Sequence, residues 1–116
     1  MESDSLNATD AAAAAVQKTP NRVSVADIKA KIIAEEYFTL GEALDALGLS
    51  KPSGADVLTI CVLTIANGFM VLGKSAPADP ANFDIATGRI LAYDEAYRQV
   101  WSLEGYVLRD RLAAQP

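Results

Sequence analysis

The first residues of this chain that could bind a ligand are arginines in its last third. Four of them fall in a stretch with helical periodicity: Arg89, Arg98, Arg109 and Arg111. A guanidinium group pairs with phosphate through two parallel hydrogen bonds, so arginines from two subunits could together form a pocket for an anion. The alternative is a solvated helix face, on which neighbouring acids such as Asp94 and Asp110 balance the arginines.

An aromatic ring stands at the expected start of the same helix. Asp79-Pro80 has the residue types of a helix cap and a first helical position, which places Phe83 in the first turn, just after Asn82. A ring beside free backbone N–H groups could stack on a base while the amides hold an anion. The alternative is a core contact for Phe83, and the negative charge of Asp79 would oppose a phosphate there.

Residues 68–75 match the phosphate-binding loop pattern G-x-x-x-x-G-K-[ST] letter for letter. That loop requires a strand before the first glycine and a helix that starts at the lysine. Here Asn67-Gly68 is typical of a hairpin turn, and the residues after it are typical of a strand. We therefore predict that Lys74 lies at the end of a strand and that the chain does not hydrolyse nucleotides.

The chain offers little for catalysis. It has no histidine, which removes the commonest general base and the commonest metal ligand. Its single cysteine, Cys61, allows no intrachain disulfide and no cysteine zinc site. The adjacent acids Glu35-Glu36 and Asp94-Glu95 would not face each other on a helix. We expect no enzymatic activity, no metal and no cofactor.

The composition limits the classes of protein to which this chain can belong. The 116 residues are enough for one domain, which buries a modest core and gains from oligomerisation. A net charge of -5 argues against a nucleic-acid-binding surface. No apolar run reaches the ~18 residues of a membrane span. Residues 1–21 are expected to form a flexible tail before one α+β domain of residues 22–116, although their alanine run could instead dock on a partner subunit.

Two helices are expected at the start of this domain. Ser24 has the residue type of an N-cap, and the apolar residues after it recur at helical spacing, so a helix is predicted over about residues 25–37. A second, shorter helix is predicted to begin after Thr39 and to end at Gly48.

A β-hairpin is expected next. Residues 57–66 are rich in Val, Ile and Thr, and Asn67-Gly68 is a strong signal for a tight turn into a return strand that ends near Ser75. A two-residue turn would place Leu63 opposite Leu72. Both faces of this hairpin are largely apolar, so helices or another subunit must cover them.

A long helix is expected from Asp79-Pro80 to about Leu112, with a length of ~45 Å. A domain of this size cannot cover such a helix, so its apolar residues, including Tyr97, Val100 and Trp101, are expected to contribute to an oligomer seam. A kink between Ser102 and Gly105 is the alternative.

Ordered motifs run through the second half of the chain: Asn67-Gly68-Phe69, Gly73-x-Ser75-Ala76, Pro80-x-Asn82-Phe83-Asp84, Gly88-Arg89, Ala92 and Trp101-x-Leu103-Glu104-Gly105-Tyr106-x-Leu108-Arg109. In these motifs, from Thr59 to Leu112, the chain resembles a family of small tailed-phage proteins. The pattern is also similar to the first type of Thoeris anti-defence protein. The resemblance implies a phage sponge that binds glycocyclic ADP-ribose signals of host immunity, and in some members cyclic oligonucleotides, without cleaving them.

The resemblance also implies a site, an assembly and a location. Phe83 would stack on a base, Arg89 and Arg109 would meet phosphates, and Asn82 and Tyr93 would make secondary contacts. The protein would form a homo-oligomer, a dimer or a hexamer built as a trimer of dimers, in the cytoplasm of the bacterial host. Because Phe83 and Arg109 are ~39 Å apart along a straight helix, they would meet only across two antiparallel chains, or serve two separate sites.

Three other functions remain open at this stage. The chain could be a phage accessory protein that inhibits a host protein by binding it through an apolar face. It could be a structural module of the virion. It could also be a nucleic-acid-binding accessory, which its negative charge disfavours.

Overall fold

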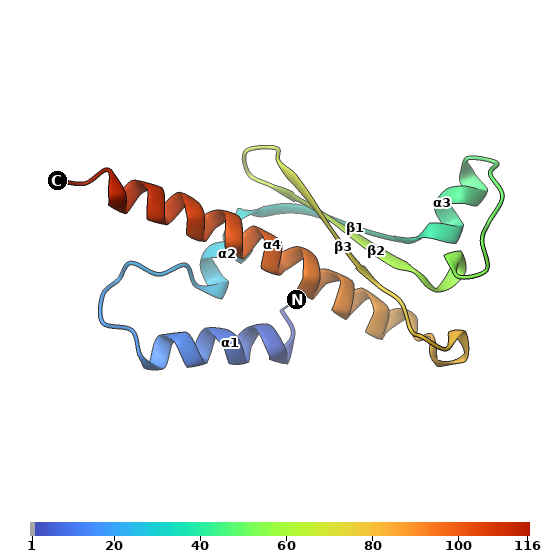
Figure 1. The fold of residues 1–116 in the computed structure, drawn as a ribbon, viewed down its shortest axis with the longest axis horizontal. Coiled ribbons are helices and arrows are strands. Elements are labelled where there is room, and N and C mark those ends of the chain that lie inside the picture. Colours follow the sequence, from blue (N-terminus) through green and yellow to red (C-terminus); the bar gives the residue numbers. More distant parts are fainter. Residues whose placement is uncertain (1) are drawn as a thin grey trace.

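A computed structural model describes residues 2–116 and confirms an α+β fold (Figure 1). The elements follow in the order α1 (Asp4–Ala15), α2 (Val25–Lys31), β1 (Ile32–Thr39), α3 (Leu40–Ala46), β2 (Thr59–Ile65), β3 (Met70–Ser75) and α4 (Ile85–Ala113), with short 3-10 turns at Ala55–Val57 and Pro80–Asn82. The molecule is elongated, with principal extents of 56 × 28 × 19 Å.

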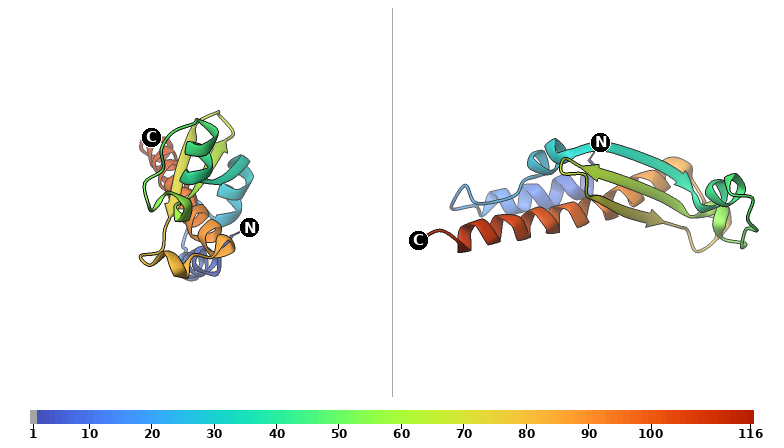
Figure 2. Two further views of the ribbon diagram at one scale, coloured as in Figure 1. Left: turned by 90° about the vertical axis from the view of Figure 1, so that its right-hand side faces the viewer. Right: turned by 90° about the horizontal axis from the view of Figure 1, so that it is seen from above.

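The three strands form one antiparallel sheet in the order β1-β2-β3. Helix α4 runs along one face of this sheet, and α1 and α2 lie beside α4 (Figures 1 and 2). The C-terminal turns of α4 extend past the edge of the sheet (Figure 1). Along residues 2–116, no helix is both long and apolar enough to cross a membrane.

The core lies between the sheet and α4. Cys61 and Leu63 of β2 are fully buried against Ala96, Tyr97 and Val100 of α4. The rings of Tyr93, Tyr97 and Trp101 follow one another along α4, with centroids 5.5 and 6.0 Å apart. Burying this aromatic row supplies much of the apolar contact in a small domain.

The helix predicted over residues 25–37 is wrong in its second half. Helix α2 begins at the predicted cap, Ser24, but ends at Lys31, and residues 32–39 form β1. The stretch is rich in β-branched and aromatic residues, which suit a strand. Pairing with β2, in which Tyr37 lies opposite Cys61, then decides its conformation. The next helix, α3, begins after Thr39 as predicted, and Thr39 is its N-cap.

The hairpin exists, but its predicted register is wrong by one residue. Val62 pairs with Leu72, and Leu63 pairs with Val71. The loop has three residues, because the Ile65 N–H donates to the Phe69 carbonyl at 2.9 Å. Gly68 takes a positive φ of 90°, as the left-handed position of such a loop requires. The shift points Leu63 and Val71 toward α4 and leaves Leu72 half exposed.

The segment predicted as a flexible tail contains helix α1. Its N-cap is Ser3, whose hydroxyl accepts a hydrogen bond from the Leu6 N–H at 3.2 Å. Leu6 is fully buried in the same core cluster as Ile28 and Val100. An isolated alanine-rich helix is marginal in water, so this packing of Leu6 explains why the segment is ordered here.

The long helix is present as α4, with 29 residues and no break at Ser102 or Gly105. It begins at Ile85, five residues later than predicted, because Asp79 caps the 3-10 turn and Asp84 caps α4. Tyr97 and Val100 are fully buried within this chain. A seam between subunits therefore cannot use those two side chains, contrary to the prediction from sequence.

Candidate functional site

The predicted ligand residues Asn82 and Phe83 lie together where the β3–α4 connection meets the start of α4. They line a small hollow of about 100 Å³ with Ser75, Pro77 and Leu91, among others. Phe83 lies just before α4 and not in its first turn, and it is half-buried. Small-molecule pockets usually measure ~300–1,000 Å³. This hollow is therefore smaller than a usual small-molecule pocket.

The start of α4 already carries a negative charge. The Asp84 carboxylate accepts hydrogen bonds from the Thr87 backbone N–H at 2.9 Å and from its hydroxyl at 2.7 Å. These two bonds hold the pKa of Asp84 below its ordinary value. An ionised cap satisfies the first amides of the helix and opposes an anion at this point. The surface beside Phe83 is therefore better suited to contact with an aromatic ring than to contact with a phosphate group.

Arg89 and Tyr93 lie in a second hollow, of about 300 Å³, between α4 and β1. Its other walls are Glu35, Tyr37, Ala86 and Ile90. The Arg89 guanidinium stands over the Tyr37 ring, 5.6 Å from the ring centroid. Stacking on an aromatic face orients a guanidinium while leaving its N–H edge available for an anion.

Tyr37 and Glu35 are site residues that the sequence reasoning missed. It placed both on a helix, whereas pairing of β1 with β2 puts Tyr37 opposite Cys61 and Glu35 opposite Leu63, on the side of the sheet that faces α4. The β-branched and aromatic content of residues 32–39 was the signal that could have revealed the strand. Burial raises the pKa of Tyr37, and the nearby Cys61 and Glu35 raise it further.

Tyr93 contributes its ring to this hollow, but its hydroxyl is engaged elsewhere. The side chain is 3% exposed, and its hydroxyl donates to the Glu2 carboxylate at 2.6 Å. Burial, and after it the contact with Glu2, raises the pKa of Tyr93. Glu2 comes from the segment before α1, so this segment takes part in the region.

Arg109 is separated from the other predicted site residues. It is exposed near the C-terminal end of α4, 20 positions and therefore ~30 Å from Arg89 along the helix. Within one chain, Asn82 and Phe83 line one hollow, and Arg89 and Tyr93 line another. Arg109 lines neither of these hollows.

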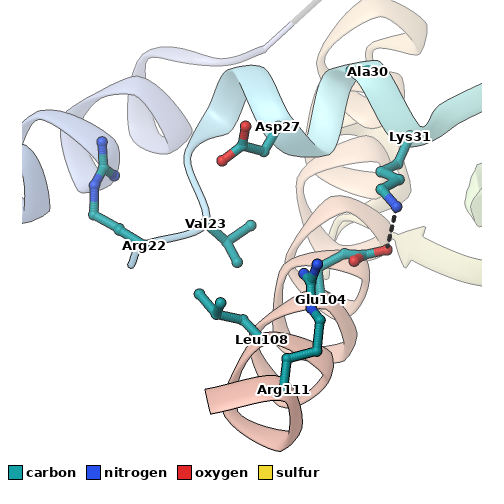
Figure 3. A pocket seen from close by; sticks show the side chains of 8 residues that line it. All are labelled: Arg22, Val23, Asp27, Ala30, Lys31, Glu104, Leu108 and Arg111. Carbon is teal, nitrogen blue, oxygen red and sulfur yellow. Dashed lines mark ion pairs between the residues drawn. The ribbon is translucent and has the colours of Figure 1, made fainter. Parts of the chain in front are cut away.

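A third hollow, of about 380 Å³, lies between α2 and the C-terminal half of α4 (Figure 3). Its charged lining is mixed: Arg22, Asp27, Lys31, Glu104 and Arg111. Lys31 forms an ion pair with Glu104 at 3.9 Å, and Arg22 turns toward α1, where it binds Asp10 at 2.6 Å (Figure 3). Acids accompany the cations in both hollows, but here Lys31 and Arg22 are paired with carboxylates.

A further hollow, of about 640 Å³, is an apolar groove between β3 and α4. Its exposed apolar residues include Phe69, Met70, Leu72, Leu103 and Tyr106, of which Tyr106 is 73% exposed. Exposed apolar surface of this kind marks sites of contact with other proteins. Among the described residues that line this groove none is charged, in contrast to the hollows around Arg89 and Arg111.

Comparison with known proteins gives one match. A model of the phage protein (N4 Gp49/phage Sf6 gene 66) family matches residues 23–112, which is well over half of the chain. No curated protein and no solved structure matches the chain significantly. Both hollows on the N-terminal half of α4 lie within the matched residues, apart from the Glu2 contact.

Proposed function

Because the chain belongs to the N4 Gp49/Sf6 gene 66 family of phage proteins, we propose that it serves a phage as a sponge for cyclic nucleotide signals of host immunity. The ligand would be a glycocyclic ADP-ribose or a cyclic oligonucleotide, bound and not cleaved. The observation that carries this proposal is the Arg89 guanidinium stacked on the Tyr37 ring at the mouth of an open hollow.

The charge of Arg89 supports a role in phosphate binding. Within residues 2–116, Arg89 forms no ion pair with a carboxylate, so its guanidinium N–H groups remain open to a ligand. The ring of Tyr37 behind it holds the guanidinium in place. Arginine suits phosphate because its planar N–H groups match two oxygens at once.

The small Phe83 hollow supports a site completed by a second subunit. One chain provides a ring and the Asn82 amide there, but too little volume for a nucleotide. Arg109 of a second chain, running antiparallel, would supply the missing wall and a second cation. We therefore include a homo-oligomer in the proposal, with ligands held between subunits in the bacterial host cell.

Binding without cleavage is supported by the side chains around the hollows. The chain contains no histidine. The pKa values of Tyr37 and Tyr93 are both raised, chiefly by burial, so neither hydroxyl serves as a base at neutral pH. A sponge needs only tight binding and slow release, which stacking rings and arginines provide.

Calorimetric titration with a panel of cyclic ADP-ribose isomers and cyclic di- and trinucleotides tests this proposal. We expect saturable binding of at least one of these compounds and recovery of the intact compound after the protein is denatured. Binding of none of them, or recovery of a cleaved product, would rule the sponge out.

The apolar groove favours a second candidate function, inhibition of a host protein by direct binding. Leu72 of β3 is one of the half-exposed apolar residues that line this groove. The two functions separate in a cellular anti-defence assay with single variants. Loss of activity in Leu72→Glu but not in Arg89→Ala favours masking of a host protein, and the reverse favours the sponge.

A further inference from the structure

The N-terminal arm, residues 2–22, lies outside the family match but packs on the matched domain. Only Leu6 of α1 is buried in the core. The arm also makes several polar side-chain contacts with the domain. Exposed polar contacts each contribute little to stability, so one apolar anchor and several weak bonds hold the arm in place.

The most buried polar contact of the arm is made by Glu2. Its carboxylate accepts the hydrogen bond from the Tyr93 hydroxyl at 2.6 Å and lies 3.6 Å from the Lys29 ammonium. The Glu2 side chain is only 8% exposed. A carboxylate is withdrawn from water to this extent only where donors and cations compensate it. Tyr93 and Lys29 are two of the groups that compensate it, and they contribute to a niche that accepts an anionic group.

This niche borders the Arg89 hollow. The ring of Tyr93 lines that hollow, while its hydroxyl points to Glu2. The next contacts along the arm continue away from the niche: Ser3 donates to Asp94 at 2.8 Å, and Arg98 donates to Ser5 at 3.0 Å. The arm thus lies along α4 from Tyr93 toward Trp101, and its first residues close the niche.

We infer that Glu2 is a built-in occupant of an anion-binding niche, and that an anionic ligand group displaces it and releases the arm. The inference rests on the proposed function in taking the Arg89 hollow as the ligand site, and it adds how that site is regulated. The ligand group is a phosphate or another oxyanion of similar size. The apparent affinity of the domain equals its intrinsic affinity multiplied by the fraction of molecules in which Glu2 has left the niche.

The test uses the full chain with Glu2→Ala and a matched control, Asp4→Ala, which removes a carboxylate from the exposed face of the same segment. Amide hydrogen exchange of residues 6–15 reports the docking of the arm without any ligand. We expect exchange to become at least about five-fold faster in Glu2→Ala and to change less than about two-fold in Asp4→Ala. Equal exchange in the two variants would overturn the role of Glu2 as a latch.

Pyrophosphate then tests the niche as an anion site, with cyclic ADP-ribose as a second probe. We expect pyrophosphate to accelerate exchange of the arm in the parent chain, and to bind about ten-fold more tightly to Glu2→Ala than to Asp4→Ala. No effect of pyrophosphate on the arm, or equal affinities, would overturn the inference. If pyrophosphate affects the arm but no cyclic nucleotide binds, the anion-binding niche is supported and the proposed sponge function is refuted.

Discussion

Gly73 of β3 lies against Ala96 of α4 so closely that a Cβ built on the glycine would stand 3.0 Å from the Cβ of Ala96. The same Cβ would overlap the backbone carbonyl of Ala92. The absence of a side chain at residue 73 therefore sets the distance between the sheet and the helix that carries the candidate site.

Replacing Gly73 with alanine is expected to destabilise the fold by ~3 kcal/mol or more, because the clash involves backbone atoms that cannot rotate away. Urea unfolding followed by circular dichroism measures the change. The control is Gly54→Ala, since a Cβ at Gly54 meets nothing within 4 Å and its φ of -94° suits any residue. Equal midpoints for the two variants would show that the sheet and α4 are not in this close contact.

Ligand binding is expected to depend on Phe83 and Arg109. Loss of a ring stacked on a base costs ~1–3 kcal/mol, and loss of an arginine paired with phosphate costs a similar amount. Phe83→Ala and Arg109→Ala should therefore each weaken binding of a cyclic nucleotide about ten- to a hundred-fold by calorimetry. Phe69→Ala, which removes a half-exposed ring in the hairpin, should leave the affinity unchanged. Parent-like affinity in both site variants would exclude these residues from the site.

The oligomer is expected to use the outward face of α4. Tyr97 and Val100 face the chain's own core, whereas Leu103, Tyr106 and Val107 are exposed. At tens of micromolar, light scattering should show more than one chain per particle for the parent and a smaller particle for Tyr106→Glu. Leu47→Glu is the control, because Leu47 is 70% exposed and lies at the end of α3. A monomeric parent protein would contradict the prediction that α4 forms an interface between subunits.

Acid is expected to loosen the N-terminal arm through Asp10. This carboxylate accepts hydrogen bonds from Arg22 at 2.6 Å and from the Val25 N–H at 3.1 Å, and the bond from Arg22 holds the pKa of Asp10 below its ordinary value of 3.8. A folded-state pKa below the unfolded value contributes stability above pH 3.8, and this contribution disappears as the pH falls through the folded-state pKa.

Thermal unfolding of the parent and of Asp10→Asn across this range measures the effect. The parent should be the more stable protein near neutral pH, and the difference should shrink once the pH is below 3.8. A constant difference at every pH would mean that the substitution acts through packing and not through charge.

Lys74 is expected to be dispensable for nucleotide chemistry in spite of the G-x-x-x-x-G-K-S pattern. It lies in β3, where its ammonium is 3.7 Å from Glu95, and no helix begins at this residue. Lys74→Ala should fold like the parent, and neither protein should release phosphate from ATP. ATPase activity that is present in the parent and lost in the variant would contradict this prediction.

Local signals in the sequence were sufficient for several elements. Ser24 and Thr39 form the capping boxes that begin α2 and α3, and the positive φ of Gly48 follows the end of α3. The hairpin and the long helix were also recognised from nearby residues. These features depend on hydrogen bonds between residues three to five positions apart, which the order of residue types largely encodes.

Contacts between residues that are far apart in the sequence determine the other features of the fold and of the candidate site. Residues 32–38 carry apolar side chains compatible with a helix or a strand, and pairing of Tyr37 with Cys61 selects the strand. Helix α1 is ordered because Leu6 packs into a core whose other buried residues, Val25 to Val100, lie 19 to 94 positions later in the chain. The candidate site has the same origin: Arg89 meets Tyr37, and Tyr93 meets Glu2, only after the sheet and α4 have packed. The sequence thus contains the groups of the site, but their proximity follows from burial of the apolar faces, which no local pattern specifies.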